Sequence, residues 1–154
     1  MPKIDRDAAP QLVGSSYPAP FDEPCKGRRA WRLGEAAGLT QFGVNLVTLE
    51  PGAWSSQRHW HALEDEFLQV VSGELVLIED EGETVLRAGD SAGFKAGERN
   101  GHHLVNRSDS AASFLVVGSR NLDDHGEYSD IDMRFARRYT GQTSAYSHKD
   151  GRPY

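Results

Sequence analysis

The sequence predicts an all-β domain, either a sandwich or a small barrel, with an extended N-terminal arm and a short C-terminal extension. From residue 39 onward, short runs rich in Val, Leu, Phe and Thr alternate with Gly, Asp, Glu and Ser, which are strand and turn signals. Almost no helical periodicity lies between these runs. Short strands at close spacing without intervening helices are typical of sandwiches and barrels.

Residues 1–38 differ in composition and periodicity from the rest of the chain. They hold five of the seven prolines and show no sustained helical or alternating period, which predicts an extended arm. Two alternatives remain for this arm. It is either a partly ordered tail, or a segment that lies across the domain or a partner subunit with Trp31 and Leu33 as anchors.

Residues 39–119 are the predicted barrel domain. Its expected strands are the segments 39–49, 65–71, 74–80, 83–89, 90–97, 102–108 and 113–119. Residues 120–154 form a polar C-terminal extension, in which one or two helical turns are expected around residues 131–139.

Composition narrows the function classes. A chain of 154 residues fits one domain. The net charge of −6 gives no general reason to expect nucleic-acid binding. Cys25 is the only cysteine, so no intramolecular disulfide can form, which suits a reducing compartment. The start lacks the apolar run of a secretory signal, and no stretch approaches the roughly 20 apolar residues of a membrane span. We expect a soluble, cytoplasmic protein without nucleic-acid or membrane partners.

The stretch RHWHALEDEF, residues 58–67, contains two histidines and a glutamate that could bind a metal ion. Side chains alternate along a strand, so His59 and His61 would share one face while Trp60 points away. Imidazole nitrogens bind several divalent metals, and a carboxylate completes a ligand set that leaves positions open for substrate. A hairpin after His61 would bring Glu66 beside the two histidines.

Residues 52–73 have the spacing of a known motif. Gly52, His59, His61, Glu66 and Gly73 lie at nearly the spacings of the first signature motif of the cupin superfamily, and this stretch resembles it. The gap between Gly52 and His59 is one residue longer than is usual in that family.

A second motif follows in GDSAGFKAGERNGHHLVN. Its glycines, His102 and Asn106 resemble the second cupin motif, with Lys95 in the usual proline position and two extra residues before His102. The spacing to Asn106 favours His102 over His103 as the third histidine, and His103 would then face away. The resemblance covers residues 39–119.

The resemblance implies a fold and a metal site. The fold is the double-stranded β-helix, a small antiparallel barrel or jelly roll, with one divalent metal ion, Zn, Fe, Mn or Ni, bound by His59, His61, Glu66 and His102. Four apolar residues are expected to line or underlie the pocket, namely Leu68, Phe94, Val70 and Leu104. Small barrels of this family also imply a homodimer, to which the N-terminal arm would offer a strand.

Two function classes follow. One is a small metalloenzyme, such as an isomerase or epimerase, a lyase or a dioxygenase, that acts on a small polar or anionic metabolite. Single-domain cupins are often likened to sugar-phosphate isomerases of the mannose-6-phosphate isomerase kind, although the sequence contains no phosphate-binding loop. The other class is a non-catalytic module that senses or stores a small molecule. Catalytic residues are not assigned; Glu64 and Asp65 are either a general base or solvated turn residues.

Overall fold

Two sheets form the body of the domain and a third covers one side. A computed structural model describes residues 3–136 and 145–154. The large sheet contains β1 (Gln11–Val13), β2 (Arg28–Trp31), β3 (Phe42–Leu49), β9 (Ala112–Ser119), β4 (Glu66–Ser72) and β7 (Ser91–Phe94), in that spatial order. The second sheet contains β6 (Gly82–Arg87), β5 (Glu74–Glu79) and β8 (His103–Val105). The C-terminal sheet contains β10 (His125–Glu127), β11 (Arg134–Ala136) and β12 (Ala145–Ser147).

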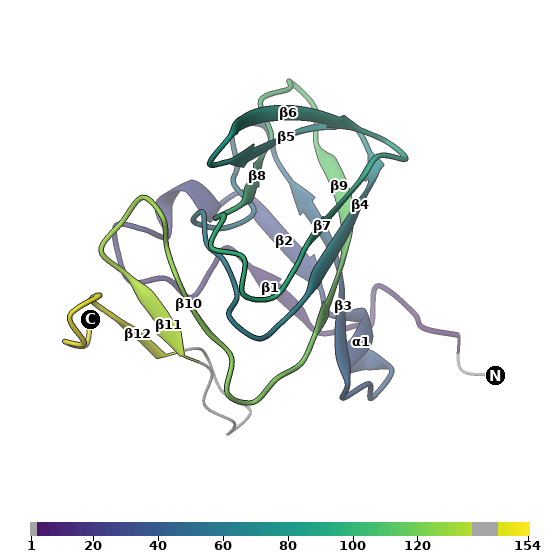
Figure 1. Ribbon diagram of the computed structural model, residues 1–154. Helices are drawn as coiled ribbons and strands as arrows, with labels where there is room; N and C mark the ends of the chain where they lie inside the picture. Colours follow the sequence, from purple (N-terminus) through teal and green to yellow (C-terminus); the bar gives the residue numbers. More distant parts are fainter. Residues whose placement is uncertain (1–2, 137–144) are drawn as a thin grey trace.

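The predicted all-β fold is confirmed. Each strand pairs antiparallel with its neighbours, and the described helices are only α1 (Leu33–Ala36) and a 3₁₀ turn, η1 (Glu23–Cys25). Figure 1 shows β5 and β6 across one end of the domain, β4 and β9 along one side, and the C-terminal sheet on the opposite side. None of the helices in the described residues is long and apolar enough to cross a membrane.

The core lies between the two larger sheets. Alternate residues of β3, β4 and β9 point inward, as the period of two requires. The buried cluster contains Ala30, Val47, Leu49, Ala53, Leu68, Val70, Leu75, Leu77, Leu86, Leu104, Ala112 and Phe114. Three residues expected near the pocket, Leu68, Val70 and Leu104, belong to this cluster, and Phe94 packs against it.

The N-terminal segment is docked on the domain. Strand β1 pairs with β2, and β2 pairs with β3, with Trp31 opposite Leu46. Leu33 begins α1 and is half-buried. Of the two alternatives for residues 1–38, the structure has the segment that lies across the domain, because its backbone extends the large sheet.

The C-terminal extension forms strands where helical turns were expected. The expectation is wrong for Arg134–Ala136, which form β11 and pair with both β10 and β12. Residues 131–133 are described and are not helical either, whereas residues 137–139 lie outside the described residues. A second buried cluster joins both ends of the chain: Tyr128, Met133 and Phe135 pack with Tyr17, Phe21, Ile131 and Tyr146. This cluster packs the C-terminal sheet against the N-terminal segment, and the Phe135 ring also meets the ring of His61 at 5.2 Å.

Candidate metal centre

Four predicted ligands come from three separate places in the chain. His59 forms isolated bridges with His102 and with Tyr128, and His59 and His102 exchange backbone hydrogen bonds of 3.3 and 2.9 Å. Glu66 is the first residue of β4 and pairs with Phe94. His61 lies between these elements in an irregular segment rather than in the regular strand that the alternation argument assumed.

The structure brings the four side chains together. His59 Nε2 lies 3.2 Å from His61 Nε2, and His61 Nε2 lies 3.8 Å from Glu66 Oε2. The other oxygen of Glu66, Oε1, lies 3.4 Å from His102 Nε2. The rings of His59 and His102 are 5.4 Å apart. Three imidazoles and one carboxylate therefore lie side by side in one cluster, and we call its centre the convergence point.

Hydrogen bonds at the far side of two rings determine which nitrogens face this point. His59 Nδ1 donates to the carbonyl of Gln57 at 2.8 Å, and His61 Nδ1 donates to Asp124 Oδ2 at 2.7 Å. In the neutral imidazoles both Nε2 atoms then carry lone pairs. Two lone pairs that face each other at 3.2 Å repel, and a cation between them turns this repulsion into attraction.

His102 gives independent support for a cation. Within the described residues, neither of its buried ring nitrogens has a hydrogen-bond partner. A buried, unsatisfied nitrogen costs about 1–3 kcal/mol, so such atoms are uncommon in folded proteins. A metal ion at the convergence point would satisfy Nε2 of His102. The residues present therefore fit the divalent ion that the ligand pattern predicts.

The protonation states also suit a metal. Burial, with the neighbouring charges of His61 and His102, lowers the pKa of His59 to about 3. Burial alone would raise the pKa of Glu66, but the contact with His102 at 3.4 Å and the charges of the other two histidines outweigh it and lower that pKa to about 2. At neutral pH the site offers a neutral imidazole and a carboxylate, the forms that bind metal ions.

Phe94 fixes the ring of His102. The two rings are stacked, with centroids 3.5 Å apart and planes 2° apart. His103 faces the other way: its Nδ1 donates to the carbonyl of Ser56 at 2.9 Å, and its ring meets Trp54 edge-on at 4.7 Å. The geometry therefore agrees with the sequence argument that distinguished the two histidines.

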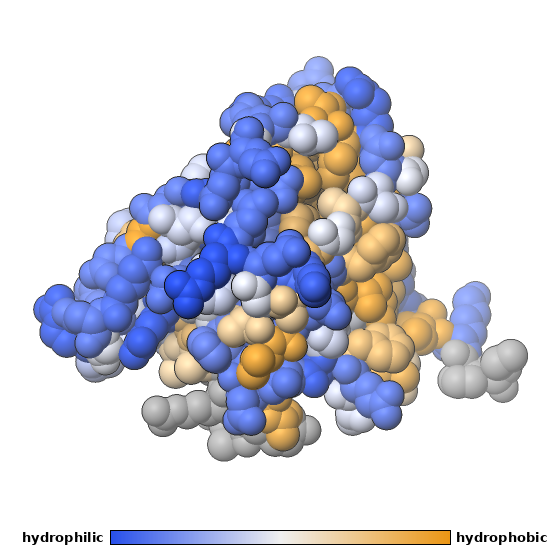
Figure 2. All heavy atoms as spheres, in the orientation of Figure 1, coloured by the Kyte–Doolittle hydropathy of each residue, from blue (hydrophilic) through white to orange (hydrophobic). Residues whose placement is uncertain are grey.

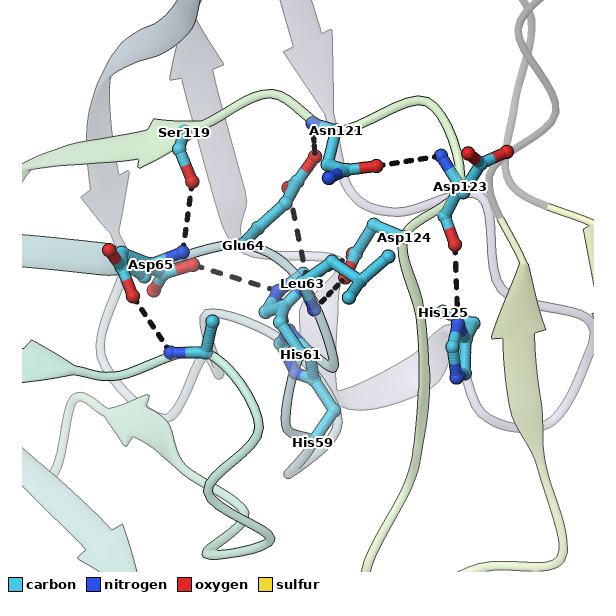
Figure 3. Close-up of polar contacts among 12 residues, drawn as sticks. His59, His61, Leu63, Glu64, Asp65, Ser119, Asn121, Asp123, Asp124 and His125 are labelled. Atoms are coloured by element: carbon cyan, nitrogen blue, oxygen red, sulfur yellow. Dashed lines mark hydrogen bonds and ion pairs between the residues drawn. The ribbon is translucent and has the colours of Figure 1, made fainter.

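Two buried carboxylates lie behind His61 (Figure 3). Asp124 has no exposed surface and also accepts the backbone N–H of Leu63 at 2.9 Å. Glu64 is 4% exposed, accepts the N–H of Asn121 at 2.8 Å, and lies 4.0 Å from His61 Nδ1.

His61, Glu64 and Asp124 offer ligand atoms within 4.8 Å of one another, which is itself a candidate metal-binding group. In this conformation the hydrogen bond at 2.7 Å places a proton on Nδ1 of His61. Both carboxylates therefore lie at the Nδ1 side of the His61 ring, and its Nε2 remains available at the convergence point. No sequence signal pointed to Asp124, which lies in the predicted extension. Of the two alternatives for Glu64, a general base or a solvated turn residue, the second is wrong, because the side chain is buried.

A pocket opens in front of the histidines. Its walls are Trp60, His61, Glu64, Glu79, Gly93, Phe94, Lys95, Glu98, Asn100 and His102. Arg99 lies over the Trp60 ring at 5.2 Å. Polar and charged groups dominate these walls, as expected of a site for a polar ligand.

The fold and this site define a class: a small antiparallel β-barrel with a three-histidine, one-carboxylate centre. The cupin domain model matches residues 45–118. A crystal structure described as a sugar phosphate isomerase of the cupin superfamily, from Silicibacter pomeroyi, is 49% identical, covers 99% of this chain and 96% of its own, and superposes with a TM-score of 0.94. The chain belongs to the cupin superfamily.

Further structures are similar over less of the chain. A putative sugar phosphate isomerase from Acidithiobacillus ferrooxidans is 27% identical over 82% of this chain and 80% of its own, with a TM-score of 0.74. The polyketide cyclase RemF from Streptomyces resistomycificus is 19% identical over 77% and 79%, with a TM-score of 0.63, and shares the fold alone. Among curated proteins, none matches this chain significantly.

Proposed function

We propose that this chain is a metal-dependent isomerase that acts on a small phosphorylated sugar. The observation that carries the proposal is the convergence of His59, His61, His102 and Glu66 with lone pairs and negative charge directed at one point. The reaction class rests on the 49% identical relative, which is described as a sugar phosphate isomerase and matches along almost the whole chain.

The ligand set suits this chemistry. When bound, a divalent ion would act as a Lewis acid on a carbonyl or hydroxyl oxygen of the substrate. His59, His61, His102 and Glu66 would hold it, and three neutral imidazoles with one carboxylate leave it a net positive charge.

Residues of the pocket walls would bind the phosphate group, transfer a proton and contact the sugar. Lys95 is exposed at the pocket and carries a positive charge that would pair with the phosphate group. The carboxylates of Glu79 and Glu98 line the same pocket and are the candidates for moving a proton between neighbouring substrate carbons. Trp60 offers an apolar surface for the sugar ring or chain.

Metal analysis is the first test. The purified wild-type protein, prepared under air and anaerobically, is compared with a His59→Ala, His61→Ala double variant and with His103→Gln as a matched control. We expect about one zinc, manganese, iron or nickel ion per chain in the wild type and in the control, and less than about a tenth of that in the double variant. A folded wild type without metal affinity would overturn the proposal.

The reaction class needs a second experiment. Metal-loaded protein is incubated in D₂O with aldose and ketose phosphates, and proton NMR follows interconversion and deuterium incorporation at the carbon beside the carbonyl. Both signals are expected in the wild type and neither in the double variant. Metal and sugar-phosphate binding without exchange would indicate the non-catalytic binding module instead. Iron in the protein with substrate-dependent oxygen uptake would indicate a dioxygenase.

A further inference from the structure

Glu79 and Asn100 form a hydrogen-bonded pair in the wall of the pocket. Asn100 Nδ2 donates to Glu79 Oε1 at 3.2 Å, and Asn100 Oδ1 accepts the backbone N–H of Asp80 at 2.9 Å. Because a backbone donor holds the oxygen of the amide, its nitrogen faces the carboxylate. The orientation of both groups is therefore fixed by their surroundings, and we call these two side chains the Glu79–Asn100 pair.

Strand β5 directs Glu79 into the barrel beside the metal ligands. Leu77 belongs to the buried core, and side chains two residues apart in a strand point to the same side. Ile78 pairs with His103 of the neighbouring strand β8. The next position in this register sets Glu79 beside His102, and both residues line the pocket. A carboxylate thus ends a row of apolar core residues at the point where the ligand cluster begins.

Each member of the pair has a hydrogen-bonding group left for a ligand. Within the described residues, neither Glu79 Oε2 nor the second N–H of Asn100 Nδ2 has a hydrogen-bond partner. Both side chains are partly buried. An acceptor beside a donor matches hydroxyl groups, which donate one hydrogen bond and accept another. The bond to the carboxylate would be the stronger, charge-assisted kind.

The charges of the pocket walls favour hydroxyls at the pair and a phosphate elsewhere. Lys95 follows β7 of the large sheet, whereas Glu79 ends β5 of the second sheet. A phosphate group is attracted to Lys95 and repelled by the carboxylate of Glu79. Neutral hydroxyls meet no such repulsion. Figure 2 shows mostly hydrophilic residues over the part of the molecule where Figure 1 draws the segment between β7 and β8.

We propose that the Glu79–Asn100 pair binds two neighbouring hydroxyl groups of the substrate, so that the substrate is a sugar phosphate of at least five carbons. This inference rests on the proposed isomerase function. With the carbonyl carbon and its neighbour at the convergence point, the next two hydroxyls lie at the pair and the phosphate lies at Lys95. A triose phosphate has no hydroxyls left for the pair. Glu79 is then a binding residue, and the exposed Glu98 remains the candidate for proton transfer.

Calorimetric titration of the metal-loaded, full-length protein with ribitol 5-phosphate tests this proposal. This five-carbon probe has no carbonyl group, so it is not isomerised during the measurement. Three analogues of the probe each lack one of the hydroxyls on its second, third and fourth carbons. We expect the wild type to bind at least about tenfold more weakly when either of two neighbouring hydroxyls is missing. In Glu79→Ala these losses should fall below about threefold, because the carboxylate that accepts the bond is gone.

Glu81→Ala is the matched control. Glu81 is an exposed carboxylate in the turn after β5, so this variant should keep the losses of the wild type. Asn100→Ser covers the case in which Glu79→Ala does not fold, and it should reduce the same losses. Circular dichroism and metal content are measured on every sample. Equal losses in the wild type and in the folded variants of the pair overturn the proposal, and so does a wild type that binds every analogue as tightly as the probe, or does not bind the probe.

Deuterium exchange into ketose phosphates, measured on the same preparations, separates this proposal from the isomerase proposal. Exchange in the wild type without any dependence on the hydroxyls overturns the role of the pair and leaves the isomerase. Dependence on the hydroxyls that requires Glu79, without exchange, overturns the isomerase and leaves the pair as a binding site for polyhydroxy ligands. Exchange that Glu79→Ala abolishes while the hydroxyl losses stay unchanged would make Glu79 the base that transfers the proton, which also overturns the proposal.

Discussion

Asp124 accepts the Nδ1–H of His61 at 2.7 Å, although 62 residues separate the two along the chain. The carboxylate has no exposed surface and holds the backbone of Leu63 with its other oxygen. It therefore fixes both the tautomer and the orientation of His61, which directs Nε2 at the convergence point. A carboxylate behind a histidine ligand also increases the basicity of the ring.

The first prediction concerns this relationship. Asp124→Asn replaces one of two acceptor oxygens by a donor, so either His61 or Leu63 loses its partner. We expect metal affinity to fall about 10- to 100-fold, measured by competition with a chelator. Asp123→Asn is the control, because Asp123 is the exposed neighbour and should leave affinity unchanged. Equal affinities for both variants would show that Asp124 does not position a ligand.

The second prediction separates two adjacent histidines. His102→Gln should lower metal affinity at least about a hundredfold, since it removes one of four ligands. His103→Gln should retain the metal, and its loss of the bond to Ser56 and of the Trp54 contact should lower the free energy of unfolding by about 1–3 kcal/mol. Metal content and urea unfolding of the apo proteins measure the two effects. The reverse pattern would make His103 the ligand.

The third prediction concerns pH. Arg58 Nε and Nη2 donate to Asp130 at 2.9 and 2.8 Å, and the same guanidinium pairs with Asp80. The hydrogen bond from Arg58, which outweighs the opposing effect of burial, lowers the pKa of Asp130 below its ordinary value. The stabilisation is therefore present above the unfolded pKa, about 3.9, and is lost as the pH falls through the lower folded pKa.

Because Asp130 is 60% exposed, the contribution should be below about 1 kcal/mol. Urea unfolding of the wild type and Asp130→Asn at several values between pH 3 and pH 7 measures it. The wild type should be more stable near pH 7, and the difference should shrink as the pH approaches 3. A difference that grows toward acid pH would contradict this account of the ion pair.

The fourth prediction concerns the attachment of the C-terminal sheet. Gly126 pairs with Phe135, and a β-carbon at this position would collide with the Trp60 carbonyl and lie 2.7 Å from Phe135 Cε1. Gly126→Ala should therefore displace β10 from the segment that carries the histidines and reduce the free energy of unfolding by about 1–3 kcal/mol or more. Gly118→Ala, whose β-carbon would lie at an ordinary 3.5 Å from the Asp65 carbonyl, is the matched control in thermal unfolding.

Much of this architecture can be predicted from the sequence because its signals are local. Alternation of apolar residues and the glycine-containing turns indicated the strands of the barrel, and the short spacing from His59 to Glu66 limited how far apart those side chains could lie. The distance from His102 to Asn106 likewise distinguished His102 from His103. The sequence left two alternatives for the N-terminal segment, because the pairing of β1 and β2 depends on a strand edge that β3 supplies.

By itself, the sequence determined the all-β class and the order of the strands along the chain, since each depends on periods and spacings of a few residues. The four residues offered as ligands followed from the resemblance of two short motifs to those of the cupin superfamily. The tertiary structure decided the acceptor behind His61, the role of Phe94 against His102 and the strand pairing of Arg134–Ala136. Each of these depends on contacts between segments far apart in the chain. Such contacts exist only after the sheets have packed, because burial and hydrogen-bond geometry depend on which surfaces meet.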